Sequence, residues 1–199
     1  NIFMKHLLLP ALLLFSVSSY AQIYRAGQGT PVNFSRLEIS VGMGLTSSSL
    51  QDPSGDTIIH DKNFTDFRLL YGLSSRFALG PAIYFSNKQD NQPLISSYKT
   101  RRLGVLGKFN LSPDTTPRSY AVAEAGAMKR SISYLRSLED SATSPYLMFG
   151  LGTEVDIYSG FFWGLEGRVS YCFKDNLGNF FQINSPWEAS FTLRTGFHF

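Results

Sequence analysis

The chain has 199 residues, which suits one domain, and carries 18 Lys and Arg against 15 Asp and Glu, a formal net charge of +3. The two signs are interspersed without a basic stripe or a nucleic-acid-binding motif, which argues against nucleic acid as a partner. Cys172 is the single cysteine, so an intramolecular disulfide and a multi-cysteine metal site are excluded. Aromatic residues make up 15%, an excess typical of membrane-interface belts.

Residues 1–21 have the order of a secretory signal peptide. Lys5 supplies the positive end, an apolar run over 7–15 interrupted by Pro10 follows, and small and polar residues lead to Ala21. The run is too short for a membrane anchor; the alternative is a buried N-terminal helix. We predict cleavage after Ala21, a short lead-in over 22–34 and a folded domain over 35–199. No later stretch is apolar enough for a transmembrane helix.

From residue 35 onward, apolar and polar residues alternate over segments of about ten residues, the length that a tilted membrane strand needs. In the first segment Leu37, Ile39 and Val41 share one face, and Glu38 and Ser40 share the other. The pattern predicts an all-β fold, an eight-stranded antiparallel up-and-down transmembrane β-barrel. The eight segments lie at 35–45, 64–73, 77–85, 101–110, 120–128, 147–157, 163–173 and 187–199.

Two segments fit the pattern less simply. Pro81 lies within the third, where proline removes a hydrogen-bond donor of the ladder. In the fifth segment, alternating alanines do not show which face points inward, although the charge of Glu124 favours the face that carries this residue.

Connections between the segments alternate in length. Residues 74–76 and 159–160 form tight turns and 111–118 a moderate one, whereas 46–63, 86–100, 129–144 and 174–186 are long. Short turns face the periplasm in outer-membrane barrels. We therefore predict four long extracellular loops, with both termini on the periplasmic side.

Aromatic residues gather near the ends of the predicted strands and predict two girdles. The group near the short turns is Phe77, Phe109, Tyr120, Tyr158, Phe161, Phe162, Trp163, Phe197 and Phe199, and the group near the long loops is Phe64, Phe85, Tyr98, Tyr146, Phe173 and Trp187.

The polar face distinguishes a lipid-facing barrel from a soluble, lipocalin-like barrel with an apolar interior. It carries both signs among glycines and serines, which suits a narrow lumen closed by ion pairs, because eight strands leave room only for side chains. The charged residues of this face are Glu38, Asp66, Arg68, Arg102, Lys108, Glu124, Glu154, Glu166, Arg168, Glu188 and Arg194.

The export signal, the eight alternating segments, the alternating loop lengths and the ending Phe197-His198-Phe199 resemble the small outer-membrane barrels of the OmpA transmembrane-domain and OmpX type. The resemblance covers nearly all of the mature chain and rests on pattern. It implies that the terminal aromatic residues, Phe199 with Phe197, serve as a signal for the barrel-assembly machinery.

The candidate site is a charge network in the lumen, with a structural role as its simplest interpretation and a very small gated pore as the alternative. Its predicted members are Arg36, Glu38, Arg68, Glu124, Glu154, Glu166, Arg168, Glu188 and Arg194.

No cofactor, metal or catalytic residue is predicted. Neither His60 nor His198 is paired with a serine in the sequence, and the aspartates near His60 do not match a calcium motif. We expect a non-enzymatic outer-membrane protein that contributes to envelope integrity or to surface contacts through its loops, with membrane lipid and the assembly machinery as partners. The alternatives are a soluble periplasmic ligand-binding barrel and a lipid-modifying enzyme.

Overall fold

A computed structural model describes residues 37–51, 57–89, 95–134, 138–158, 160–173, 176–177, 181–183 and 185–199. The predicted signal peptide, the lead-in and Arg36 lie outside the described residues. Within the described residues, no helix is long and apolar enough to cross a membrane.

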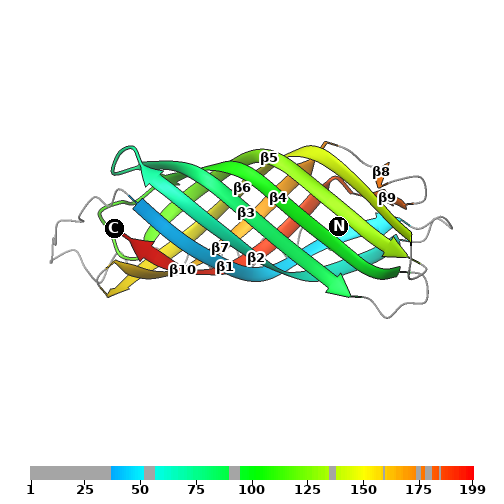
Figure 1. Ribbon diagram of the computed structural model, residues 1–199. Helices are drawn as coiled ribbons and strands as arrows, with labels where there is room; N and C mark the ends of the chain where they lie inside the picture. Colours follow the sequence, from blue (N-terminus) through cyan, green and yellow to red (C-terminus); the bar gives the residue numbers. More distant parts are fainter. Residues whose placement is uncertain are drawn as a thin grey trace.

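Eight long strands form a closed antiparallel barrel, which confirms the predicted fold class (Figure 1). Neighbours in sequence are neighbours in the wall, and the pairing of β10 with β1 closes the ring. The strands are β1 (Leu37–Gln51), β2 (Thr57–Gly72), β3 (Phe77–Gln89), β4 (Ile95–Asn110), β5 (Arg118–Tyr134), β6 (Leu138–Tyr158), β7 (Phe161–Cys172) and β10 (Trp187–His198), with two short strands, β8 (Asn176–Leu177) and β9 (Phe181–Ile183), before the last.

The first and last strands close the barrel through a continuous ladder. The register runs from Glu38 opposite His198 to Ser47 opposite Ala189. Beyond it, the amide of Leu37 donates to the carbonyl of Phe199 at 3.2 Å, and the amide of Phe199 donates to Leu37 at 2.8 Å. Closure pairs the edges that an open sheet would leave exposed.

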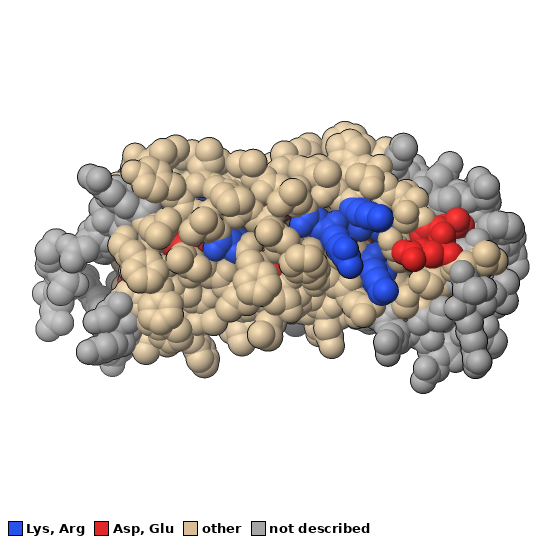
Figure 2. Space-filling model, in the orientation of Figure 1, with Lys and Arg blue, Asp and Glu red and all other residues tan. Residues whose placement is uncertain are grey.

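The alternation places apolar side chains on the outside of the wall and charged ones inside. Met43 is 63% exposed and Phe149 61% exposed, whereas Glu166 and Arg194, on the other face, are fully buried. Most of the near wall in Figure 2 is uncharged, and its surface charges gather toward the end of the barrel opposite Leu37 and Phe199, in one basic group and one acidic group beside it. The lipocalin-like alternative needs the opposite facing and is therefore wrong for this chain. In β5, Glu124 faces the lumen, and Ala123, Ala125 and Ala127 face outward.

The strands extend well beyond the predicted segments at the end of the barrel opposite Leu37 and Phe199, which we call the long-strand end. β6 alone has 21 residues, about 70 Å of extended chain at ~3.3 Å per residue. Three of the four predicted long loops are therefore mostly strand, and their connections narrow to residues 52–56, 90–94 and 135–137. The prediction placed these boundaries wrongly because apolar and polar residues no longer alternate regularly there, while backbone pairing does not depend on side-chain polarity.

The predicted girdles are correct only in part. Phe77, Phe109, Trp163, Phe85 and Trp187 are exposed on the outer wall. Five other predicted girdle residues are buried in the lumen, because they share the phase of the charged residues on their own strands: Phe64, Tyr98, Tyr120, Tyr146 and Phe162. Proximity to a strand end does not determine which way a side chain faces, whereas phase does.

The fourth predicted loop contains a short hairpin at the long-strand end. Its strand β9 pairs with β1, while β8 contacts β5 and β6. Since β1 and β5 stand on opposite sides of the eight-stranded ring, these contacts place the hairpin across the opening. Figure 1 shows β8 and β9 at this end of the barrel.

Candidate functional site

Charged side chains inside the barrel form three clusters along its length. In the described part of the chain they comprise eight Lys and Arg side chains, seven acidic ones and His198, so the two signs nearly balance; Asp156 is exposed at the rim. The mouth cluster, at the short-turn end, is Glu38, Lys108, Arg118, Glu154, Asp156 and His198; the central cluster is Asp66, Arg68, Glu166, Arg168 and Arg194; the upper cluster is Lys62, Arg102, Glu124, Arg130 and Glu188.

The central cluster joins three arginines to two carboxylates. Arg68, on β2, donates to both carboxylate oxygens of Glu166, on β7, at 2.8 and 2.5 Å. Arg194, on β10, donates through one nitrogen to both oxygens of Asp66 at 2.6 and 2.8 Å. Arg168 contacts both acids. Such multidentate charge-assisted bonds offset the cost of burying the ions.

The upper cluster centres on Glu188 of β10. Its carboxylate accepts hydrogen bonds from Arg130 of β5, at 2.8 Å, and from Arg102 of β4. The Arg102 guanidinium also lies over the ring of Tyr84, 4.3 Å from its centroid. The hydroxyl group of Tyr146 donates a hydrogen bond to the carboxylate of Glu124. Aromatic rings thus supply further contacts for these cations beside the two carboxylates.

Lys62 occupies the same level of the lumen. Its ammonium lies 3.3 Å from the centroid of the Tyr98 ring and donates to the hydroxyl of Thr100 at 3.4 Å. Tyr98 is therefore a lumen residue that faces a cation, which accounts for its place inside the wall.

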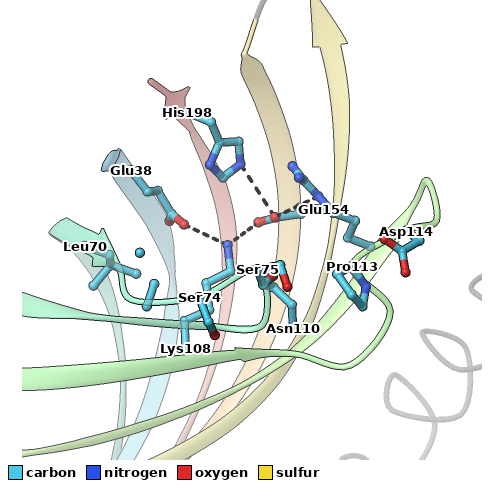
Figure 3. Close-up of a pocket in the computed structure, with 13 residues that line it drawn as sticks. Glu38, Leu70, Ser74, Ser75, Lys108, Asn110, Pro113, Asp114, Glu154 and His198 are labelled. Atoms are coloured by element: carbon cyan, nitrogen blue, oxygen red, sulfur yellow. Dashed lines mark hydrogen bonds and ion pairs between the residues drawn. The ribbon is translucent and has the colours of Figure 1, made fainter. Parts of the chain in front are cut away.

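The mouth cluster lines a small cavity of about 70 Å³ (Figure 3). Lys108 stands between two acids, with its ammonium 2.8 Å from Glu38 and 2.6 Å from Glu154. Arg118 also approaches Glu154, at 3.3 Å, and His198 approaches the same carboxylate at 3.6 Å. The cavity has room for a few water molecules at most.

Glu38, Glu154 and His198 bring potential metal-ligand atoms within 4.8 Å of one another. However, the Lys108 ammonium lies between the two carboxylates and contacts both of them, as Figure 3 shows. A divalent cation there would meet a positive charge already in place. The arrangement suits an ion-pair cluster better than a metal centre.

Local sequence explains how the clusters fit into so narrow a lumen. A Cβ atom on Gly42 would lie 2.4 Å from the Asp66 carboxylate and 2.8 Å from an Arg194 nitrogen. A Cβ atom on Gly152 would lie 2.4 Å from the ring of Tyr120. Large lumen side chains therefore depend on glycines that are their register partners on the adjacent strands.

The structure places eight of the nine predicted network residues inside the barrel, and Arg36 lies outside the described residues. Glu38 and Glu154 belong to the mouth cluster. The central cluster holds Arg68, Glu166, Arg168 and Arg194, and the upper cluster holds Glu124 and Glu188.

The sequence prediction missed Lys62, Arg118 and Arg130 as lumen residues. Lys62 and Arg130 fall in segments that were predicted as loops, and Arg118 falls in the moderate turn. Each shares the phase of an acid on its own strand: Lys62 with Asp66, and Arg118 and Arg130 with Glu124. Continuing the alternation past the apolar segments would have found them.

Phe197 and Phe199 are exposed on the outer wall at the short-turn end. The Phe197 ring packs against Phe161, at 5.1 Å between centroids, and lies 6.1 Å from the ring of Phe199. Both side chains are therefore accessible from outside the barrel.

No protein-family model and no curated protein matches the sequence of this chain. Solved structures do match. Neisserial surface protein A has a TM-score of 0.57 at 12% identity, with 81% of this chain and 97% of that chain covered. Ail, the attachment invasion locus protein of Yersinia pestis, has a TM-score of 0.51 at 14% identity, with 82% of this chain and 99% of that chain covered. The outer membrane protein OprG from Pseudomonas aeruginosa has a TM-score of 0.52 at 11% identity, with 84% of this chain and 99% of that chain covered.

At these identities the similarity concerns the fold, which agrees with the ring closure, the strand number and the outward apolar face described above. The chain has the fold of the small eight-stranded outer-membrane β-barrels.

Proposed function

We propose that this protein is a non-enzymatic outer-membrane barrel with a closed lumen, which strengthens the envelope and presents its long-strand end outside the cell. The observation that carries the proposal is the cross-lumen ion pairing. Arg102 and Glu188 contact each other although their strands, β4 and β10, have three strands between them on either side of the ring. Side chains that meet across the lumen leave no continuous water path.

Residence in a membrane is supported by the outer wall. The outward residues of β6 are apolar at Leu147, Phe149, Leu151, Val155 and Ile157. This run is about 36 Å of strand, which at a tilt of about 40° matches the ~25 Å apolar band of outer-membrane barrels. The short turns then face the periplasm, and the polar outward residues of β6 before Leu147 stand outside the band.

The surroundings of His198 support a non-enzymatic role. Its Nε2 faces Glu154 and Asp156, at 3.6 and 4.0 Å, and its ring stacks on Phe162. In the described part of the chain, no serine hydroxyl is hydrogen-bonded to this ring, whereas a serine hydrolase needs such a base beside its nucleophile.

Surface contact is the proposed use of the long-strand end. The extended strands and the hairpin β8–β9 hold the connecting segments on a rigid support, which is how loops become binding surfaces. A structural neighbour, Ail, has been solved in complex with the heparin analogue sucrose octasulfate, so a barrel of this fold can bind a small ligand that is not a lipid.

Two measurements test the proposal. Unboiled protein extracted from outer membranes should migrate faster than boiled protein on a gel, because a folded barrel stays compact in detergent. In planar bilayers, the purified barrel should give no stable conductance steps, while an open porin in the same bilayers does. A protein that is soluble and unshifted would refute membrane residence, and steady ohmic steps would refute the closed lumen.

A further inference from the structure

Three basic side chains on the outer wall are separate from the lumen clusters. Lys99 and Arg101 on β4 and Lys129 on β5 are exposed, and we call them the outer basic patch. Arg101 and Lys129 are direct register partners, and Lys99 is the diagonal neighbour of Lys129. Such neighbours have Cβ atoms about 5 Å and 7 Å apart. The three charged groups can therefore converge on one ligand, and Figure 2 shows blue side chains together in this part of the wall.

The outer basic patch lies where the apolar band ends. One step toward the short turns, the outward residues are Leu103 and its register partner Ile83, both exposed and apolar. In the row of Arg101, the partner on β3 is Phe85, the last large apolar residue facing outward on that strand; Asn87 follows. This border is the depth of lipid headgroups for a barrel seated on its apolar band.

In the described part of the chain, no carboxylate lies within ion-pair distance of Lys99, Arg101 or Lys129. Lys99, Arg101 and Lys129 are the Lys and Arg residues among the outward strand residues whose side chains are described. The positive charge of the outer wall is therefore concentrated on β4 and β5. Like charges directly opposite each other in a sheet are destabilising. A counter-charge from outside the protein would relieve this repulsion.

We propose that the outer basic patch binds the phosphate groups of a lipid in the leaflet at the long-strand end. This inference rests on the membrane-spanning role proposed above. The guanidinium of Arg101 offers a bidentate fork to phosphate oxygens, and the two ammonium groups add point charges beside it. Lipid confined to the membrane meets the patch at headgroup depth with its acyl chains already against the apolar wall, so little further ordering is needed.

The test uses the purified, detergent-folded full-length protein and native mass spectrometry to count the lipids that each barrel retains. The probes are dioleoyl phosphatidic acid and dioleoylglycerol, which share their acyl chains and differ in the phosphate. The test variant combines K99Q, R101Q and K129Q. The matched control is R76Q, because Arg76 is exposed in the turn at the opposite end. Heat-modifiability on a gel verifies that each protein is folded.

We expect the wild-type barrel and R76Q to retain phosphatidic acid at least tenfold more tightly than dioleoylglycerol, and the triple variant to lose this preference. Equal retention of the two lipids by the wild type, or an unchanged preference in the triple variant, overturns the inference. The inference is also overturned if the triple variant loses the binding of sucrose octasulfate in solution but retains phosphatidic acid as the wild type does. A barrel that is folded but indifferent to phosphate refutes only this inference, whereas a protein that is not heat-modifiable refutes the proposed function.

Discussion

Arg102 and Glu188 form an ion pair across the full width of the barrel. They are 86 residues apart in sequence, and both side chains are almost fully buried, at 4% and 3% exposure. Glu188 also accepts a hydrogen bond from Arg130 at 2.8 Å. One carboxylate therefore ties β10 to β4 and β5, so the opposite walls of the ring are held together by a side chain as well as by the backbone ladder.

Replacing Glu188 by Gln should destabilise the barrel strongly. Two buried guanidinium groups would lose their anionic partner, and breaking buried pairs by removing one member costs about 3–5 kcal/mol. Urea unfolding in lipid vesicles, followed through the fluorescence of the two outward tryptophans, Trp163 and Trp187, measures the change. The matched control is Glu139→Gln, because Glu139 is exposed on β6. Equal stability of the two variants would contradict the role given to Glu188.

Alanine at Gly42 should disturb the central cluster. The added Cβ would lie 2.4 Å from Asp66 and 2.8 Å from Arg194, so these side chains must shift, and overpacking of this kind costs about 1–3 kcal/mol. Gly167→Ala provides the control, because a Cβ atom there meets nothing within 4 Å. The same unfolding titration should show a loss for Gly42→Ala only. A loss of similar size in both variants would mean that strand glycines matter for a reason other than lumen space.

The thiol of Cys172 should report on folding. Cys172 is 1% exposed inside the wall, with its Sγ 2.9 Å from the hydroxyl oxygen of Ser144. We expect maleimide labelling of the folded barrel to be at least a hundredfold slower than labelling in urea, because a buried thiol is inert. The control is a double variant, Ser75→Cys with Cys172→Ser, which carries its thiol at an exposed position. This thiol should react at similar rates in the folded barrel and in urea. Fast labelling of Cys172 in the folded barrel would show that the lumen admits the reagent.

Removing the terminal ring should reduce assembly in cells without preventing folding in detergent. Phe199 joins the β1–β10 closure through its backbone, which Phe199→Ala leaves intact, while its exposed ring is available to assembly machinery. The folded, heat-modifiable fraction in outer membranes should fall several-fold. Phe173→Ala, which removes an exposed ring near the other end of the barrel, is the control. Normal assembly of Phe199→Ala would refute a signalling role.

The alternation of residue types determined the wall of this protein without help from tertiary structure. Because successive side chains of a strand point to opposite faces, the phase of Leu37, Ile39 and Val41 against Glu38 and Ser40 already separates the lipid side from the lumen side. The same rule, continued through the polar segments, assigns Lys62 and Arg130 to the lumen. Fold class and facing are therefore local properties that the sequence carries.

Tertiary structure alone decided which charges meet and where the strands end. The contact between Arg102 and Glu188 depends on strand order and on the stagger of the closed ring, which no local pattern encodes. The extension of the strands beyond the apolar band, as in β6 (Leu138–Tyr158), depends on backbone pairing with a neighbour and leaves no hydrophobic period to read. The outer basic patch arises in the same way, because the β4–β5 register places Arg101 beside Lys129.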